Sequence, residues 1–166
     1  MVNNLKKLSM LLCSTALVFA TAARGDDSAA YFGIKAGALM PNVDELEEAY
    51  IGGLTVGYGR AFAIEAELTT TLFPGETALS DVEWDMTTLA LYGVYRSSAK
   101  VYFKLKAGAL HEQVTFNAAG VNLQNKENGV SAGLGMGYRV DNQTRVEVEY
   151  TIVDEDISMF TLGYLF

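Results

Sequence analysis

The last nine residues, Ser158-Met159-Phe160-Thr161-Leu162-Gly163-Tyr164-Leu165-Phe166, place large apolar and aromatic side chains at alternate positions, separated by threonine, glycine and leucine. In a β-strand, alternate side chains point to opposite faces, so this segment would present one strongly apolar face. A soluble protein rarely leaves such a strand at an edge, because the edge invites aggregation. A strand that faces lipid and closes a barrel has no free edge. The segment therefore predicts a membrane β-barrel.

The first 25 residues have the pattern of a secretory signal peptide. Lys6 and Lys7 form a basic start, an apolar run follows over residues 8–20, and Ala20-Thr21-Ala22 offers a small-x-small cleavage site. The apolar run is too short for a membrane-spanning helix. We predict a signal peptide over residues 1–22, with cleavage after Ala22 or, as a second choice, after Gly25.

The composition of the remaining chain combines acidity with hydrophobicity. Half of the whole chain is hydrophobic, 16 residues are glycine, and the net charge of −8 becomes −11 once the three basic residues within positions 1–25 are removed. Such a negative surface repels nucleic acid. The single cysteine, Cys13, lies in the apolar run of the signal peptide, so the exported chain would have no disulfide.

The chain after residue 28 gives eight candidate strands when it is read at a period of two residues. Their ranges are 31–40, 49–59, 62–72, 82–96, 101–116, 129–140, 145–152 and 158–166. Short turns follow the second, fourth and sixth strands, and longer polar loops, including 117–128, follow the first, third and fifth. Outer-membrane barrels have short periplasmic turns and longer outer loops. The expected fold is all-β, an eight-stranded antiparallel up-and-down transmembrane β-barrel over residues 29–166.

The two faces of these strands differ in polarity. One face is apolar, and the other carries charged residues and most of the glycines. A soluble lipocalin-like barrel would also show two faces, but the signal peptide and the aromatic residues near strand ends favour the membrane. Those aromatic residues are Tyr50, Tyr58, Phe62, Trp84, Tyr138, Tyr164 and Phe166. Strand 82–96 is ambiguous, and its charges suggest that Glu83, Asp85 and Thr87 face inward while Trp84 and Met86 face outward.

The inward face should carry a balanced set of five basic and five acidic residues. They are Lys35, Glu65, Glu67, Asp85, Lys104, Lys106, Arg139, Arg145, Glu147 and Glu149. Side chains just fill the lumen of an eight-stranded barrel. Charges buried there need partners, because desolvation without a partner costs several kcal/mol. We predict a salt-bridge network across the lumen. It either plugs the barrel or lines a narrow gated conduit, and the size of the barrel favours the plug.

The signal peptide, the eight alternating segments, the lumenal glycines and the terminal Phe166 together resemble small bacterial outer-membrane β-barrel proteins of the OmpA-like, Opa-like and OmpW-like kind. The resemblance implies a place in the outer membrane of a Gram-negative bacterium. It implies that Phe160, Leu162, Tyr164 and Phe166 are read by the barrel-assembly machinery. The expected partners are outer-membrane lipid, lipopolysaccharide, that machinery and a host or surface ligand, with the barrel a monomer.

Two features raise the question of a site. Some barrels of this kind act on lipids with a histidine, a serine and an acid, and His111 lies beside Glu112, one strand from Ser131. No nucleophile adjoins the histidine in a recognisable motif, so we expect no catalytic residue, cofactor or bound metal. The outer loops form an acidic rim, which is either simply solvated or binds divalent cations or a cationic partner. The rim residues are Asp44, Glu45, Glu47, Glu48, Asp154, Glu155 and Asp156.

The function expected from these features is that of a surface protein with a filled, salt-bridged lumen, in a structural, envelope-integrity or surface-interaction role. The alternative is a narrow porin-like channel or a transporter of a small hydrophobic solute. A lipid-modifying enzyme is the third hypothesis, and the missing catalytic motif disfavours it.

Overall fold

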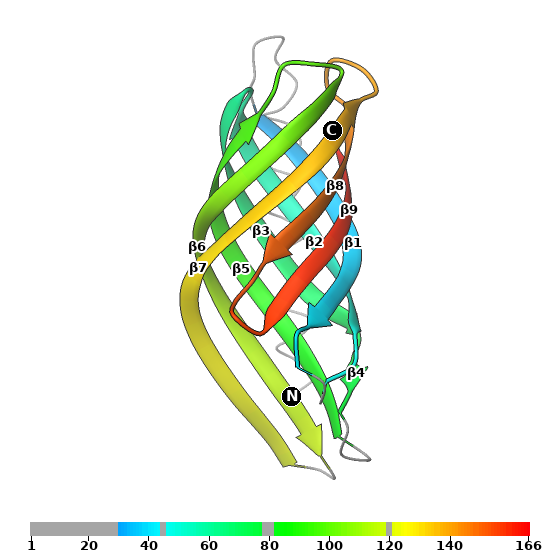
Figure 1. Cartoon of the computed structure of the whole chain (residues 1–166), viewed down its shortest axis with the longest axis vertical. Coiled ribbons are helices and arrows are strands. Elements are labelled where there is room, and N and C mark those ends of the chain that lie inside the picture. The colour runs from blue at the N-terminus through cyan, green and yellow to red at the C-terminus, as the bar shows by residue number, and fades with distance from the viewer. Residues whose placement is uncertain (1–29, 44–45, 78–81, 119–120) are drawn as a thin grey trace, which may run out of the picture.

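The chain forms a closed antiparallel β-barrel (Figure 1) in a computed structural model that describes residues 30–43, 46–77, 82–118 and 121–166. The strands are β1 (Ala30–Pro41), β2 (Ala49–Gly59), β3 (Phe62–Phe73), β4 (Gly75–Glu76), β5 (Val82–Arg96), β6 (Val101–Ala118), β7 (Val121–Arg139), β8 (Arg145–Ile152) and β9 (Ile157–Leu165). Eight of them pair with their neighbours along the chain, and β9 pairs with β1 to close the wall. The short β4 pairs with β5 beyond the end of β3. The prediction of an all-β, eight-stranded barrel is confirmed, with β4 as an addition.

Parts of the sequence prediction fall outside the described residues. The signal peptide over residues 1–22 and both of its cleavage sites lie there, as do Asp44 and Glu45 of the acidic rim. Among the residues that are described, no helix has the length and hydropathy that a membrane crossing requires.

The two ends of the barrel differ in the length of their connections. Short turns join β2 to β3, β5 to β6 and β7 to β8 at one end, where backbone hydrogen bonds also tie Phe32 to Phe166. At the other end β6 and β7 project beyond the remaining strands (Figure 1). Because short turns face the periplasm in outer-membrane barrels, we call the short-turn end periplasmic and the end with the projecting hairpin extracellular.

The outer wall of the barrel is an apolar belt. Ile34, Leu91, Phe103, Leu134 and Leu162 from five different strands all point outward and are 52–65% exposed. An exposed apolar surface of this extent is unusual on a soluble monomer and is typical of a lipid-facing wall. The alternation of the strands therefore places the apolar face against lipid and the polar face in the lumen.

Six of the seven aromatic residues expected near the membrane interfaces are exposed on the outer wall. They are Tyr50, Tyr58, Phe62, Tyr138, Tyr164 and Phe166. Near the periplasmic end, Phe62 contacts Tyr95 with ring centroids 5.1 Å apart. The seventh, Trp84, was wrongly assigned to the outer wall, because its side chain is fully buried inside the barrel.

The misplacement of Trp84 reflects a wrong parity for the whole of β5. Trp84 and Met86 point inward and are buried, whereas Glu83, Asp85 and Thr87 lie on the opposite face. Asp85 therefore does not belong to the lumen, and its carboxylate accepts a hydrogen bond of 3.1 Å from the side chain of Asn117. The outer part of β5 extends toward the extracellular end, where the outward face meets water and the inward face closes an apolar core. In this part of β5, the charged residues therefore lie on the outward face and the apolar residues on the inward face.

The predicted polar loop over residues 117–128 is also wrong. The structure extends β6 to Ala118 and begins β7 at Val121, with their residues paired in register up to Ala118 and Val121. The segment lacks an apolar face because residues 122–130 are exposed on both faces of the hairpin. A periodicity of apolar residues cannot reveal a strand that has water on both sides.

The turn between β2 and β3 depends on Gly59, whose φ of 131° lies in a region that residues with a Cβ rarely adopt. A Cβ at this position would also lie 2.2 Å from the carbonyl oxygen of Phe62. We expect Gly59→Ala to lower the free energy of unfolding by more than about 1 kcal/mol. Urea titration of the micelle-bound barrel, followed by the fluorescence of Trp84, measures this. Gly129→Ala is the control, because its Cβ would meet nothing within 4 Å, and equal losses for the two variants would contradict the prediction.

Candidate functional site

The charged side chains of the lumen are organised around Arg96, whose side chain is fully buried. Its Nε donates to Glu147 Oε1 at 2.7 Å, its Nη1 donates to the hydroxyl of Tyr31 at 2.9 Å, and its Nη2 contacts Glu65 Oε1. The planar guanidinium thus joins carboxylates of β3 and β8, strands that lie apart in the barrel wall. A guanidinium suits this place because its donors have a fixed fork geometry.

Three lysines complete the network on the extracellular side of Arg96. Lys104 Nζ lies 2.8 Å from Glu65, 2.8 Å from Glu147 and 2.6 Å from Glu149. Lys35 and Lys106 each bridge Glu67 and Glu149 over 2.8–3.3 Å. We call the eight residues the lumenal network: Lys35, Glu65, Glu67, Arg96, Lys104, Lys106, Glu147 and Glu149. Its formal charges cancel, so each buried ion has a counter-ion within direct contact.

Two tyrosines extend the network toward the periplasmic end. The hydroxyl of Tyr31 donates to Glu65 at 2.8 Å, and that of Tyr102 donates to Glu147 at 2.5 Å. Each ring occupies the space left by an inward glycine, because a Cβ at Gly57 or Gly137 would lie 2.2 Å from the Cζ atom of the facing tyrosine. The lumenal glycines therefore make room for aromatic rings that support the ions, a role that the sequence pattern did not reveal.

The ten residues predicted for the lumen fall into three groups. Seven of them belong to the lumenal network. Arg139 and Arg145 lie near the periplasmic end, where Arg139 donates to the carbonyl of Ser97 at 2.9 Å and Arg145 stacks 4.1 Å above the ring of Tyr31. Asp85 lies outside the lumen. Arg96 was missed because the wrong parity of β5 placed it on the outer wall.

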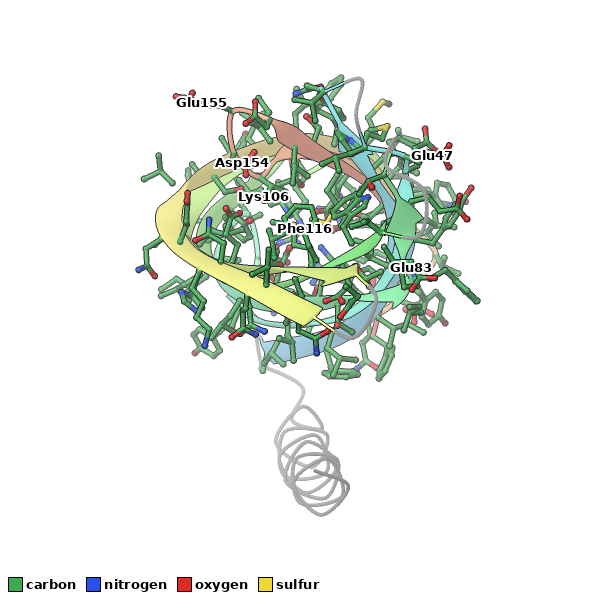
Figure 2. All side chains as sticks on the ribbon, turned by 90° about the horizontal axis from the view of Figure 1, so that it is seen from below. Glu47, Glu83, Lys106, Phe116, Asp154 and Glu155 are labelled. Atoms are coloured by element: carbon green, nitrogen blue, oxygen red, sulfur yellow. The ribbon has the colours of Figure 1, made fainter. Side chains whose placement is uncertain are left out.

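The extracellular half of the lumen holds an apolar core. We call it the apolar cap: Leu39, Ile51, Trp84, Met86, Leu110, Val153, Ile157 and Met159, all at most 5% exposed. Trp84 Nε1 donates to the carbonyl of Glu47 at 3.0 Å, which joins the cap to the chain between β1 and β2. Val114 and Phe116 pack against this core, and Figure 2, seen from the extracellular end, shows Phe116 over the interior.

The projecting hairpin leaves one side of β7 without a neighbouring strand. β8 pairs with β7 only from Ala132 to Arg139, whereas β6 pairs with β7 as far as Val121. The β8–β9 connection, with Asp154 and Glu155, therefore ends well short of the hairpin tip (Figure 1). The part of β7 before Ala132 therefore has a strand neighbour on one side only.

Three carboxylates interact near this part of β7. Glu112 on β6 is paired directly with Glu127 on β7, so the two like-charged side chains share a face of the hairpin. Burial, reinforced by the neighbouring Asp154 and Glu127, raises the pKa of Glu112 to about 7. Glu112 is only 5% exposed, its buried Oε2 accepts from no N–H or O–H donor, and a hydrogen bond to the Asp154 carboxyl helps to raise its pKa. We call Glu112, Glu127 and Asp154 the mouth carboxylates. In the described part of the chain, no group of three or more potential ligands has an arrangement that would hold a metal ion.

The raised pKa of Glu112 predicts a stability that depends on pH. Because the folded state holds this proton more tightly than the unfolded chain, the stabilisation is present below pH 4.5 and is lost as the pH rises through about 7. The expected loss is about 1–3 kcal/mol for the projecting hairpin, measured by amide hydrogen exchange. Glu112→Gln should flatten this profile, whereas Glu83→Gln on the outer face should leave it intact. A wild-type profile that stays flat between these pH values would contradict the prediction.

The remaining residues of the acidic rim have different roles. Glu47, Glu48, Glu155 and Asp156 are exposed, and Figure 2 shows Glu47 and Glu155 at separate places on the rim. Asp154 instead accepts hydrogen bonds of 2.7 Å and 2.6 Å from the backbone N–H groups of Asp156 and Ile157. Asp154 thus also fixes the shape of the β8–β9 turn.

His111 and Ser131 lie on opposite faces of the barrel wall. His111 is exposed, and its Nδ1 is 2.8 Å from the side-chain oxygen of Asn128. Ser131 is buried, donates to the carbonyl of Ile152 at 2.7 Å and accepts a hydrogen bond of 3.0 Å from Tyr92. A histidine and a nucleophile must be within hydrogen-bond reach to work together, so this geometry does not support the hypothesis of a lipid-modifying enzyme.

Comparison with solved structures finds the same barrel in several bacterial proteins. Neisserial surface protein A superposes with a TM-score of 0.66 at 12% identity, over 83% of this chain and 96% of that one. The outer-membrane protein OprG of Pseudomonas aeruginosa gives a TM-score of 0.58 at 13% identity, over 84% and 97%. Ail of Yersinia pestis, solved in complex with the heparin analogue sucrose octasulfate, gives 0.55 at 16% identity, also over 84% and 97%. At these identities the likeness shows the fold alone.

The comparison of sequences gives the family. No curated protein matches the chain closely enough to be counted as a relative. The family model of the outer membrane protein beta-barrel domain matches residues 9–164, almost the whole chain. Together with the closed eight-stranded wall, its lipid-facing belt and its filled polar lumen, this match shows that the chain belongs to the outer-membrane β-barrel family of bacteria.

Proposed function

We propose that the protein is a sealed barrel that acts as a surface-interaction protein through its extracellular end, with a contribution to envelope integrity. The observation that carries this proposal is the filling of the lumen along its length, with the lumenal network on one side and the apolar cap on the other. A barrel without a path through it presents one surface to the outside, the end that bears the projecting hairpin and the acidic rim.

The lumenal network argues against a conduit for ions. An ion that entered would have to displace Arg96 or Lys104 from carboxylates that they contact at 2.6–2.8 Å. Removing one partner from a buried ion pair leaves an uncompensated charge, which is strongly unfavourable. The network therefore acts as a structural plug of the barrel.

The apolar cap adds a second barrier on the extracellular side. Trp84, Met86 and Leu39 are at most 1% exposed and belong to the same buried cluster. A hydrophobic constriction excludes water and so opposes the passage of ions. The alternative of a narrow porin-like channel, or of a transporter for a hydrophobic solute, would require this core to open.

The charge of the rim suggests the kind of partner. Ail was solved with a sulfated, negatively charged ligand. Here Glu47, Glu48, Glu155 and Asp156 are exposed around the extracellular end. Complementary charge steers partners to a surface, so we propose a positively charged partner for this barrel.

Retention of proteoliposomes on surfaces coated with poly-lysine or with heparin tests this proposal. We expect retention on poly-lysine that weakens with added salt, and loss of most of it in the variant Glu47→Gln/Glu48→Gln/Glu155→Gln. The control is Asp141→Asn, which removes an exposed charge at the periplasmic end. Preferential retention on heparin, or equal retention of the rim variant and the wild type on poly-lysine, would overturn the proposed charge preference.

A further inference from the structure

The four lumenal carboxylates and Glu112 are all buried, but only Glu112 lacks a counter-ion. Glu65, Glu67, Glu147 and Glu149 each have a basic nitrogen at 2.6–2.8 Å. No lysine, arginine or histidine forms an ion pair with Glu112, Glu127 or Asp154 in the part of the chain that the structure describes. A protein that neutralises its other buried carboxylates leaves this group of three without a cation.

The arrangement of the mouth carboxylates is set by the backbone. Residue pairing places Glu127 directly opposite Glu112, where like charges destabilise a strand pair. The β8–β9 turn brings in Asp154, whose charge acts on Glu112. Glu112 Oε2 is buried and accepts from no N–H or O–H donor, and the Glu112 carboxyl shares a hydrogen bond with that of Asp154. Strands β6 and β7 and the β8–β9 turn thus contribute one carboxylate each, and the buried one has no cation beside it.

We propose that Glu112, Glu127 and Asp154 form a binding site for a primary ammonium group, supplied either by a lysine side chain of a partner or by a free polyamine. This deepens the proposed surface-interaction role and rests on the extracellular end being the contact surface. Before Ala132, β7 has no β8 neighbour, and the ligand would approach from this side of the hairpin.

The chemistry of the site favours an ammonium over other cations. An ammonium has three N–H donors, so it can pair with Glu112 and with a neighbouring carboxylate at the same time. Val114 and Phe116 follow Glu112 on the same face of β6 and are partly buried against the apolar cap, so they offer an apolar wall for the alkyl stem of the amine. The carboxylates also do not form a metal-ligating group in the described residues.

The protonation of Glu112 gives the site a distinctive signature. Its pKa of about 7 reflects burial and the facing charges of Asp154 and Glu127, while His111, on the other face of β6, lowers it. Glu155 and Asp156 adjoin Asp154 and add to the negative charge. An ammonium that binds here must displace the proton held by Glu112 in part of the molecules. Binding near neutral pH should therefore release protons and should strengthen as the pH rises.

Isothermal titration calorimetry of the refolded barrel in micelles tests the proposal. The probes are cadaverine and an acetylated tripeptide amide, glycine-lysine-glycine, each in two buffers of different ionisation enthalpy. We expect saturable binding with proton release, and a loss of affinity of about tenfold or more in Glu112→Gln/Glu127→Gln. Glu83→Gln is the matched control and should bind as the wild type does. Because one substitution removes a buried charge at Glu112 and the other lies at the exposed Glu127, the fold should hold, and the fluorescence of Trp84 checks this.

The outcomes separate the two sources and the two proposals. Equal binding of both probes would indicate a general amine site, and binding of the peptide alone would indicate a lysine of a protein partner. Absence of binding by both, binding without proton release, or binding of calcium in preference to either amine would overturn the ammonium site.

The calorimetry and the retention experiment together separate the two proposals. If the double variant is still retained on poly-lysine while cadaverine fails to bind, the ammonium site fails and the proposed function stands. If cadaverine binds but the poly-lysine surface retains no proteoliposomes, the proposed preference of the extracellular end for positively charged partners is wrong.

Discussion

Replacement of Arg96 by methionine should lower the free energy of unfolding of the barrel by about 3–5 kcal/mol. Arg96 is fully buried and contacts Glu65, Glu147 and Tyr31. Methionine fills a similar volume but leaves the lumenal network with one uncompensated negative charge. Equilibrium unfolding in urea, with the barrel in lipid vesicles and Trp84 as the probe, gives the change directly.

Two further variants identify the cause of that loss. Arg96→Met/Glu147→Gln restores the charge balance, because the three lysines then face three glutamates. Lys104 still contacts Glu65 at 2.8 Å and Glu149 at 2.6 Å. We expect this double variant to recover about half of the lost stability. Arg139→Met, near the periplasmic end, should cost about 1 kcal/mol or less. A loss for Arg96→Met no larger than that for Arg139→Met would show that the network does not stabilise the barrel.

Replacement of Trp84 by alanine should cost about 3–5 kcal/mol as well, for a different reason. Trp84 is fully buried in the apolar cap and donates to the carbonyl of Glu47 at 3.0 Å. Alanine would leave a cavity among Leu39, Met86 and their neighbours and would remove the partner of that carbonyl. Since Trp84 is the only tryptophan, circular dichroism or the gel mobility of unheated samples replaces fluorescence as the readout.

A lipid-facing residue provides the comparison for the cap. Leu72 is 59% exposed on the outer wall, so Leu72→Ala removes apolar volume without opening an internal cavity. We expect its cost to be well below that of Trp84→Ala. Similar costs for the two variants would mean that the cap is not a packed core.

The sequence predicted the bounds of the strands well wherever the membrane makes one face of a strand apolar and the other polar. The ranges 49–59, 82–96 and 145–152 agree with β2, β5 and β8 as observed. Lipid on one side and a polar lumen on the other produce the alternation on which those assignments depend. Beyond the membrane this contrast is lost in the hairpin of β6 and β7, and it is reversed in the outer part of β5.

The contrast in polarity between the two faces of a strand also explains which lumenal residues could be predicted. Lys104, Lys106, Glu147 and Glu149 lie on strands with a clear apolar face, so their orientation followed from parity. Arg96 lies on β5, whose first half has its charges outside and its apolar residues inside. The charge balance gave no signal either, because the predicted set of five basic and five acidic residues was already neutral without Arg96.

The mouth carboxylates could not be predicted from sequence patterns. Their grouping depends on the register that pairs Glu112 with Glu127 and on the position of the β8–β9 turn that carries Asp154. Register between strands is set by long-range packing, and the polar loop expected over 117–128 gave no reason to pair the two glutamates at all.

Single-channel recording of the refolded wild-type barrel in a planar lipid bilayer tests the sealed lumen most directly. The lumenal network and the apolar cap predict a silent protein at both polarities, with no discrete conductance steps above the leak of the bilayer. Steps in the wild type that change size or frequency in Lys104→Met would contradict this account, because they would mean that ions pass along the charges that we describe as a plug.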